Sequence, residues 1–309
     1  MIQYISFGIV IDDIVLPDGS AYMGILGGGG PQTVWGMAAA LGGGEQVGLV
    51  AEVGADLAAV ALAPLHAARI NLDGVRSTAA QTPRAWQHID AEGGRTHQWQ
   101  APPLKSITFG TSIAELLPAS YAGVRGFHWG LHPENPPLGE AQQLIHSGAQ
   151  VSLETFKPPE RPLTADALRD LIGACTVFSP NWSEAAGIVG STDYLTVINA
   201  FRVAGCQVLA LRRGSAGADV WDFRSDEAVR VPAVPTTVVD TVGAGNAFCG
   251  ALLATLDQGV EAAACQAVAA AAYMVEQFGL PDHLPEASDY AQRIAFARRG
   301  LTKLNLQRG

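Results

Sequence analysis

A glycine-rich segment, Asp-Thr-Val-Gly-Ala-Gly-Asn, occupies residues 240–246, between a β-branched run and an apolar stretch. The run at 236–239 predicts a strand, and the stretch at 247–256 predicts a helix. A glycine turn between them directs backbone N–H groups and the positive end of the helix dipole at one point. The segment therefore predicts an anion-binding site, with phosphate as its usual occupant.

Asn246 follows these glycines, at the mouth of the predicted anion site. An aspartate at this position could accept a proton from an attacking hydroxyl group, whereas the amide of Asn246 does not titrate. The segment thus combines a phosphate-binding turn with a side chain that is unsuited to general-base catalysis.

Further candidate ligand-binding residues stand directly after predicted strands. Asp12 and Asp13 end the first strand, at the edge that faces the ligand crevice in open α/β sheets. Asn181 and Glu184 follow a later strand and lie three positions apart, so one helical turn places both side chains on one side. Such a pair can hold a hydrated Mg²⁺, and capping the following helix is the alternative role for Glu184.

Two more glycine-rich turns precede or follow predicted elements. Four consecutive glycines at 27–30 come before a helix and allow a ligand to approach the backbone closely. Residues 212–217, Arg-Arg-Gly-Ser-Ala-Gly, follow another strand. Neither turn identifies a ligand by itself, because glycine-rich turns are common.

The elements that must position these residues alternate along the chain. Strands are predicted at 2–10, 46–53, 124–130, 150–155, 176–179 and 207–211. Helices are predicted at 34–41, 57–68, 139–147, 165–173, 183–189 and 194–203, with a solvated C-terminal helix over 293–308. Strands separated by single helices form parallel βαβ units, so we expect an α/β fold with a doubly wound, mostly parallel sheet and helices on both faces.

Two polar, strand-like segments, residues 12–27 and 82–101, interrupt this alternation. In the second, strands at 85–89 and 95–99 flank a hairpin loop at 90–94. We predict that the two segments form a small β-lid over the strand ends. Residues 1–11, 28–81 and 102–309 then make up the α/β core. Surface excursions without a function are the alternative interpretation.

Composition restricts the class of protein. The chain has 309 residues, of which 48% are hydrophobic, and a formal charge of −10, which argues against a nucleic-acid partner. It has no apolar run of about 20 residues and no basic N-terminal region, so we expect a cytoplasmic protein with no membrane partner and no signal peptide. The cysteines show no C-x-x-C pairing and are predicted to be reduced core residues: Cys175, Cys206, Cys249 and Cys265.

Taken in order, these segments resemble the pfkB (ribokinase-like) carbohydrate kinase family over nearly the whole chain. The matching positions are Asp13, Gly28 and Gly29 with Thr33 in place of the usual Asn, Asn181 and Glu184, Gly214 to Gly217, and the signature Asp240 to Gly245. The chain departs from the family at Asn246, where the family has its catalytic Asp. Segments 82–85, 178–181 and 276–279 look similar to the fungal "maintenance of killer" branch, which also carries Gly-Ala-Gly-Asn.

The resemblance implies a mechanism and a set of roles. Gly243, Ala244, Gly245 and Asn246 would surround an ATP γ-phosphoryl group during its transfer to the hydroxymethyl group of a sugar or nucleoside. Substrate would bind Asp13, Gly28, Gly29 and Thr33. Nucleotide would bind Asn181, Glu184, Gly214, Ser215 and Gly217, with its adenine against 268–273. Glu184 would support Mg²⁺ through water, and Asp240 with the carbonyl of Thr241 matches part of a monovalent-cation site, such as one for K⁺.

Asn246 leaves two functions open. Loss of a general base costs about 10²–10⁴-fold, so a weakened kinase is the first hypothesis, and a pseudo-kinase that binds nucleotide or sugar is the second. An oxidoreductase is disfavoured, because no G-x-G-x-x-G follows the first strand. The His128-x-x-x-His132 spacing leaves a strand and meets Pro133, which argues against a metal site. The partner is a small molecule, and the protein is a monomer or a homodimer through the lid.

Overall fold

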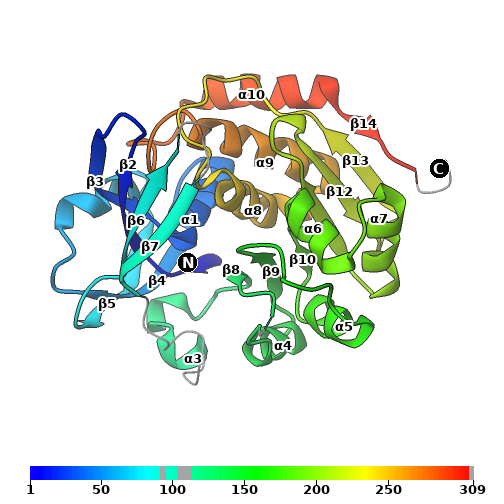
Figure 1. Ribbon diagram of the computed structural model, residues 1–309, viewed down its shortest axis with the longest axis horizontal. Helices are drawn as coiled ribbons and strands as arrows, with labels where there is room; N and C mark the ends of the chain where they lie inside the picture. The colour runs from blue at the N-terminus through cyan, green and yellow to red at the C-terminus, as the bar shows by residue number, and fades with distance from the viewer. Residues whose placement is uncertain (91–94, 103–112, 135, 306–309) are drawn as a thin grey trace.

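A computed structural model describes residues 1–90, 95–102, 113–134 and 136–305. These residues form one large sheet covered by helices on both faces and one small sheet beside it (Figure 1). Residues 91–94 of the predicted hairpin loop at 90–94 lie outside the described residues. Within the described part of the chain, no helix is both long enough and apolar enough to cross a bilayer.

The large sheet has the strand order β14-β13-β12-β11-β10-β9-β8-β1-β4-β5. Neighbours from β11 to β5 pair in parallel, while β11, β12, β13 and β14 pair antiparallel. The strands are β1 (Tyr4–Phe7), β4 (Val47–Gly54), β5 (Asn71–Ala79), β8 (Gly126–Leu131), β9 (Gln150–Thr155), β10 (Val177–Phe178), β11 (Val208–Arg212), β12 (Ala218–Asp222), β13 (Glu227–Val231) and β14 (Thr302–Lys303). The predicted doubly wound sheet is confirmed.

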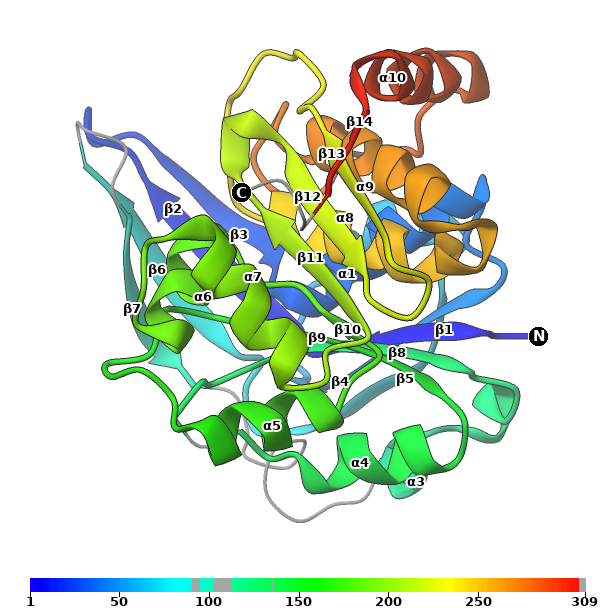
Figure 2. The same ribbon diagram turned by 90° about the vertical axis from the view of Figure 1, so that its right-hand side faces the viewer.

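Helices form a layer on each face of this sheet (Figures 1 and 2). One layer contains α1 (Gly29–Leu41), α2 (Ala63–Ala67), α8 (Ala244–Thr255) and α9 (Val260–Met274), with α10 (Ala287–Gly300) outside α9. The other contains α3 (Ile113–Leu116), α4 (Gly139–His146), α5 (Ala165–Gly173), α6 (Trp182–Val189) and α7 (Tyr194–Val203). Near-continuous apolar strands such as β11 are therefore buried from both sides.

Helices α1 and α8 pack against each other through glycines. A Cβ atom on Gly36 would lie 2.2 Å from the carbonyl oxygen of Ala247, and one on Gly250 would lie 2.0 Å from that of Thr33. Only glycine permits this approach of two backbones. The contact brings the N-termini of both helices together at the carboxyl edge of the parallel strands.

The small sheet has the order β3-β2-β6-β7, with β2 (Val10–Val15), β3 (Ala21–Gly27), β6 (Arg84–Ile89) and β7 (Arg95–Ala101). Strand β2 pairs antiparallel with β3 and parallel with β6. The two polar segments are thus joined in one sheet, as the sequence predicted.

Some predicted elements are wrong. The first strand ends at Phe7, because Gly8 has a φ of +85° and redirects the chain into β2. The helix predicted at 57–68 is a 3₁₀ turn (Ala59–Leu62) followed by the short α2. The C-terminal helix ends at Gly300, and the chain then adds β14 to the sheet.

Candidate active site

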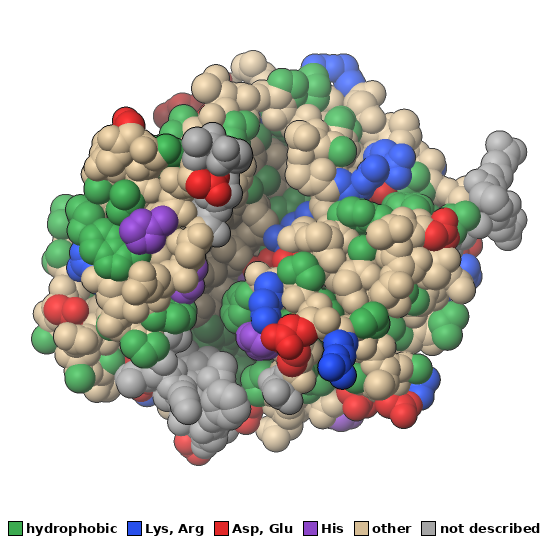
Figure 3. Space-filling model, viewed as in Figure 1, with side chains coloured by type: hydrophobic (Ala, Val, Ile, Leu, Met, Phe, Trp, Pro, Cys, Tyr) green, Lys and Arg blue, Asp and Glu red, His purple; other side chains and the backbone are tan. Residues whose placement is uncertain are grey.

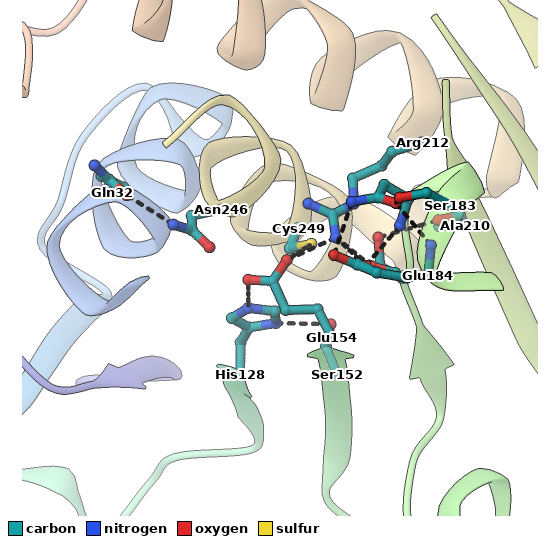
Figure 4. Close-up of polar contacts among 12 residues, drawn as sticks. Gln32, His128, Ser152, Glu154, Ser183, Glu184, Ala210, Arg212, Asn246 and Cys249 are labelled. Carbon is teal, nitrogen blue, oxygen red and sulfur yellow. Dashed lines mark hydrogen bonds and ion pairs between the residues drawn. The ribbon is translucent and has the colours of Figure 1, made fainter. Parts of the chain in front are cut away.

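The predicted phosphate turn and the predicted substrate glycines lie opposite each other at the N-termini of α8 and α1. Gly243 precedes α8 with a φ of +83°, a conformation that favours glycine. The Asn246 Nδ2 atom donates a hydrogen bond to Gln32 Oε1 at 2.7 Å (Figure 4). A Cβ atom on Gly29 would lie 3.7 Å from Asn246 Oδ1 and 4.0 Å from Nδ2, so the whole amide lies against the start of α1.

Arg212 lies directly against this phosphate turn. The sequence pattern did not predict this contact. A Cβ atom on Gly245 would lie 1.8 Å from Arg212 Nη1, so any side chain at position 245 would displace the guanidinium. Arg212 ends β11, at the carboxyl edge of the parallel strands, whereas Asp12 and Asp13, which were expected at that edge, lie within β2 of the small sheet. The edge rule could therefore have found Arg212.

Two buried carboxylates and a carbonyl hold the Arg212 guanidinium in place (Figure 4). Its Nη2 atom lies 2.8 Å from Glu154 Oε2 and 3.5 Å from Glu184 Oε2, and donates to the carbonyl of Ser179 at 2.8 Å. Burial alone would lower the pKa of Arg212, but the carboxylates, Glu154 foremost, raise it above its ordinary value. The guanidinium is therefore charged at every physiological pH.

Glu154, the last but one residue of β9, connects Arg212 to His128 and Cys249. Its Oε1 lies 3.4 Å from His128 Nε2, its Oε2 lies 3.8 Å from Cys249 Sγ, and His128 Nδ1 lies 2.9 Å from Ser152 Oγ. Burial raises the pKa of Glu154, but Arg212 and His128 bring it below its usual value, so the carboxylate is ionised.

His128, Glu154 and Cys249 also have the ligand types of a metal site, with their ligand atoms within 4.8 Å of one another. The Arg212 guanidinium, 2.8 Å from Glu154, already supplies a positive charge to this carboxylate. A metal ion would be repelled by that charge. We therefore interpret the three residues as a polar network that supports Arg212.

Asn181 and Glu184 form a capping box at the start of α6. Asn181 Oδ1 accepts from the Glu184 backbone N–H, and both carboxylate oxygens of Glu184 accept from Asn181, at 2.8 Å from its backbone N and 2.7 Å from Nδ2. Burial raises the pKa of Glu184 despite the nearby Arg212. The capping role is thus present in the structure.

A cavity of about 640 Å³ adjoins this cap and exposes Arg212. Its lining residues are Asn181, Trp182, Ser183, Tyr194, Arg212, Arg213, Gly214 and Ala216. Figure 3 shows the same face hollowed between the small sheet and the region of α6 and α7. The cavity joins Asn181 and Gly214, both predicted to bind nucleotide, to the guanidinium beside the phosphate turn. Ser215 lies in the 3₁₀ turn Gly214–Ala216, which Gly217 closes.

Asp13 lies in the small sheet and is buried. Its oxygens accept from the backbone N–H of Gly24, from Gln100 Nε2, and from Arg84 through Nε at 2.6 Å and Nη2 at 2.7 Å. Burial would raise the pKa of Asp13, but these hydrogen bonds, chiefly those of Arg84, lower it below its usual value. The carboxylate ties β3, β6 and β7 together, and a substrate hydroxyl would have to share its lone pairs.

The remaining predicted residues differ in their access to the site. Thr33 is fully buried between α1 and α8, and among the described residues its hydroxyl has no hydrogen-bond partner. Gly28 packs against β2, where a Cβ atom would lie 2.9 Å from the Val10 backbone nitrogen. Asp240 is buried below the phosphate turn, with Oδ1 accepting from Val242 N–H, and the Thr241 carbonyl accepts from Ala244 N–H at 3.4 Å.

Comparison with known proteins identifies the family of this chain. Residues 3–287 match the family described as pfkB family carbohydrate kinase. A cytidine kinase of Thermococcus kodakarensis is 27% identical over 261 residues, covering 84% of this chain and 90% of that protein. An uncharacterised protein of Schizosaccharomyces pombe is 22% identical over 320 residues, covering 91% and 86%.

Solved structures share the fold. The ribokinase of Arabidopsis thaliana, complexed with ribose and ATP, superimposes with a TM-score of 0.74 at 18% identity and covers 96% of this chain and 100% of that one. The large sheet with its two helical layers is therefore the ribokinase-like fold that the sequence predicted.

Proposed function

The chain belongs to the pfkB family of carbohydrate kinases, and from this premise we propose that it transfers the γ-phosphoryl group of ATP to a hydroxymethyl group of a sugar or nucleoside. The observation that carries the proposal is the arrangement at the N-terminus of α8, where Asn246 contacts Gln32 of α1 on one side and Arg212 lies against Gly245 on the other (Figure 4). The cytidine kinase among its relatives supports a nucleoside as one substrate class.

The nucleotide would lie along the cavity that Asn181, Gly214 and Arg212 line, close to Ser215 and Gly217, with its adenine near residues 268–273 of α9. Its γ-phosphoryl group would rest on the N–H groups of Gly243, Ala244 and Gly245. Mg²⁺ would arrive with ATP. Glu184, whose carboxylate accepts from Asn181 beside this cavity, would support this Mg²⁺ through water.

The acceptor hydroxyl would lie between Gly29 and Asn246, with Asp13 and Gly28 on the side of the small sheet, whereas Thr33 is fully buried against α8 and would not contact it. The bond from Asn246 Nδ2 to Gln32 leaves the amide oxygen beside Gly29. This oxygen can accept the hydrogen bond of the hydroxyl and orient it, but it cannot remove the proton. The transition state of phosphoryl transfer is loose, so positioning and electrostatics can sustain a weakened reaction.

A pseudo-kinase is the second candidate, and Asn246 is the observation that favours it. Such a protein would bind nucleotide or sugar at the same site without transfer.

Three finer assignments complete the proposal. Residues 12–27 and 82–101 act as a lid on the core (1–11, 28–81 and 102–309), and the protein is a monomer or a homodimer through that lid. Asp240 and the Thr241 carbonyl contribute to a K⁺ site near the phosphate turn. The Gly-Ala-Gly-Asn sequence is the feature on which we propose a similarity to the "maintenance of killer" branch.

A two-part assay tests the function. ATP or ADP with Mg²⁺ is expected to raise the melting temperature, because ligand at 100 times its Kd stabilises the fold by about 2.7 kcal/mol. An ADP-release assay over pentoses, hexoses and nucleosides is then expected to detect turnover about 10²–10⁴-fold below the ordinary 1–100 s⁻¹. Nucleotide binding without turnover of any acceptor would favour the pseudo-kinase, and the absence of binding by the folded protein would contradict both candidates.

A further inference from the structure

Arg212 and the neighbouring Arg213 are paired with different carboxylates. Arg213 is paired with the buried Asp219 at 3.4 Å, on the far side of β11 from Glu154. The Arg212 side chain is only 15% exposed and turns toward Glu154, Glu184 and Gly245. A charge buried to this extent is costly unless it is paired, so the two glutamates account for its position.

The guanidinium retains unused hydrogen-bonding capacity. Its Nη2 atom lies against Glu154 and donates to the Ser179 carbonyl, and its Nη1 atom lies against Gly245. The buried Nε atom has no hydrogen-bond partner among the described residues. A buried donor without a partner costs about 1–3 kcal/mol. The pair of glutamates therefore fixes a cation beside the phosphate turn, and the cavity that Arg212 lines gives a ligand access to it.

We propose that Arg212 is a catalytic residue that binds the phosphoryl group in transit and stabilises its transition-state charge, an inference that rests on the proposed kinase function. The acceptor oxygen forms the new O–P bond as the bond from the γ-phosphorus to the bridging oxygen breaks, and ADP leaves with that electron pair. The hydroxyl proton passes to an oxygen of the transferred group, which ends as a phosphate monoester. Glu154 and Glu184 are positioning residues for Arg212.

This role follows from the electrostatics of the transfer. Charge accumulates on the equatorial oxygens of the moving group, and a preorganised cation in a site with little water stabilises it strongly. The backbone N–H groups of the turn and the α8 dipole act at the same point.

The test uses a mimic of the moving group, so that no acceptor needs to be known. Calorimetry measures the Kd of MgADP with and without aluminium fluoride, which mimics the planar phosphoryl group. The wild-type protein is expected to bind MgADP at least tenfold more tightly with aluminium fluoride. Arg212→Met is expected to abolish this enhancement, and Arg202→Met, which removes an exposed, remote guanidinium of α7, is expected to retain it.

The outcomes separate this inference from the proposed function. A folded wild-type protein that does not bind MgADP would contradict the kinase site itself. Binding of MgADP with an equal enhancement in wild type and Arg212→Met would overturn the role of Arg212. If Arg212→Met does not fold, Arg212→Lys is measured instead, because Lys keeps the charge but not the planar guanidinium. A several-fold loss of the enhancement by aluminium fluoride in this variant supports the role of Arg212. An unchanged enhancement overturns it.

Discussion

Asn246→Asp is expected to raise the rate of phosphoryl transfer to a bound acceptor by about 10²-fold or more, because it supplies the missing proton acceptor. Asn and Asp are nearly isosteric, so the α8 N-terminus should keep its packing. Gln32, which now accepts from Asn246 at 2.7 Å, can rotate its amide and donate to the new carboxylate. The measurement is kcat in the coupled assay with the best acceptor from the screen.

The change should also have a characteristic cost. A carboxylate at position 246 lies beside the incoming γ-phosphate, and like charges repel, so nucleotide binding should be equal or weaker while kcat rises. Asn246→Ala is the control: it removes the orienting amide oxygen without adding a base and should lower kcat below that of the wild type. A wild-type rate of about 1–100 s⁻¹ would contradict the argument, since another group would then accept the proton.

Gly36→Ala is expected to destabilise the fold by about 3 kcal/mol, which is more than a hundredfold in the folding equilibrium. The new Cβ atom would lie 2.2, 2.7 and 2.8 Å from the O, Cα and C atoms of Ala247, and backbone atoms cannot rotate away as a side chain can. Helices α1 and α8 would have to separate, which also moves Gly29 away from Asn246. Chemical denaturation measures the free energy of unfolding.

Gly173→Ala provides a matched control at the end of α5. No heavy atom outside its immediate neighbours lies within 4 Å of its Cβ position, and alanine favours a helix more than glycine does. This variant should be as stable as the wild type or up to about 1 kcal/mol more stable. If the free energy of unfolding of Gly36→Ala lies within about 0.5 kcal/mol of the wild-type value, the helices do not depend on the glycine contact.

The sequence predicted the parallel part of the fold well because its signals are local. Apolar runs bounded by turn residues identify β9 (Gln150–Thr155) and α5 (Ala165–Gly173) at the residues where they occur. Strands β12 and β13 were missed, because they continue the sheet antiparallel through short turns and no helix marks them. The grouping of residues 12–27 with 82–101 in one small sheet was predicted, but the parallel register of β2 with β6, about 70 residues apart, is a long-range pairing that periodicity does not encode.

The candidate site likewise combines residues that local sequence predicts with residues that only the packing of distant elements brings together. Gly243 and Asn246 were found because the turn and the helix that follows it are contiguous in the sequence. Arg212, Glu154 and Gln32 come from β11, β9 and α1, and only the packing of these elements brings them to the turn. Asn181 and Glu184 were located correctly as a pair, but spacing alone could not decide between a metal site and the capping box that forms.

We propose that the α8 N-terminus and Arg212 bind the phosphates of a nucleotide. The most direct test of this phosphate binding is to displace a bound fluorescent ATP analogue with ADP and, separately, with adenosine, both with Mg²⁺. Hydrogen bonds to charged groups contribute about 1.5–3 kcal/mol each, so the account predicts that ADP binds at least about 30-fold more tightly than adenosine. Equal displacement by the two compounds would show that this site does not recognise phosphate, and would contradict the account.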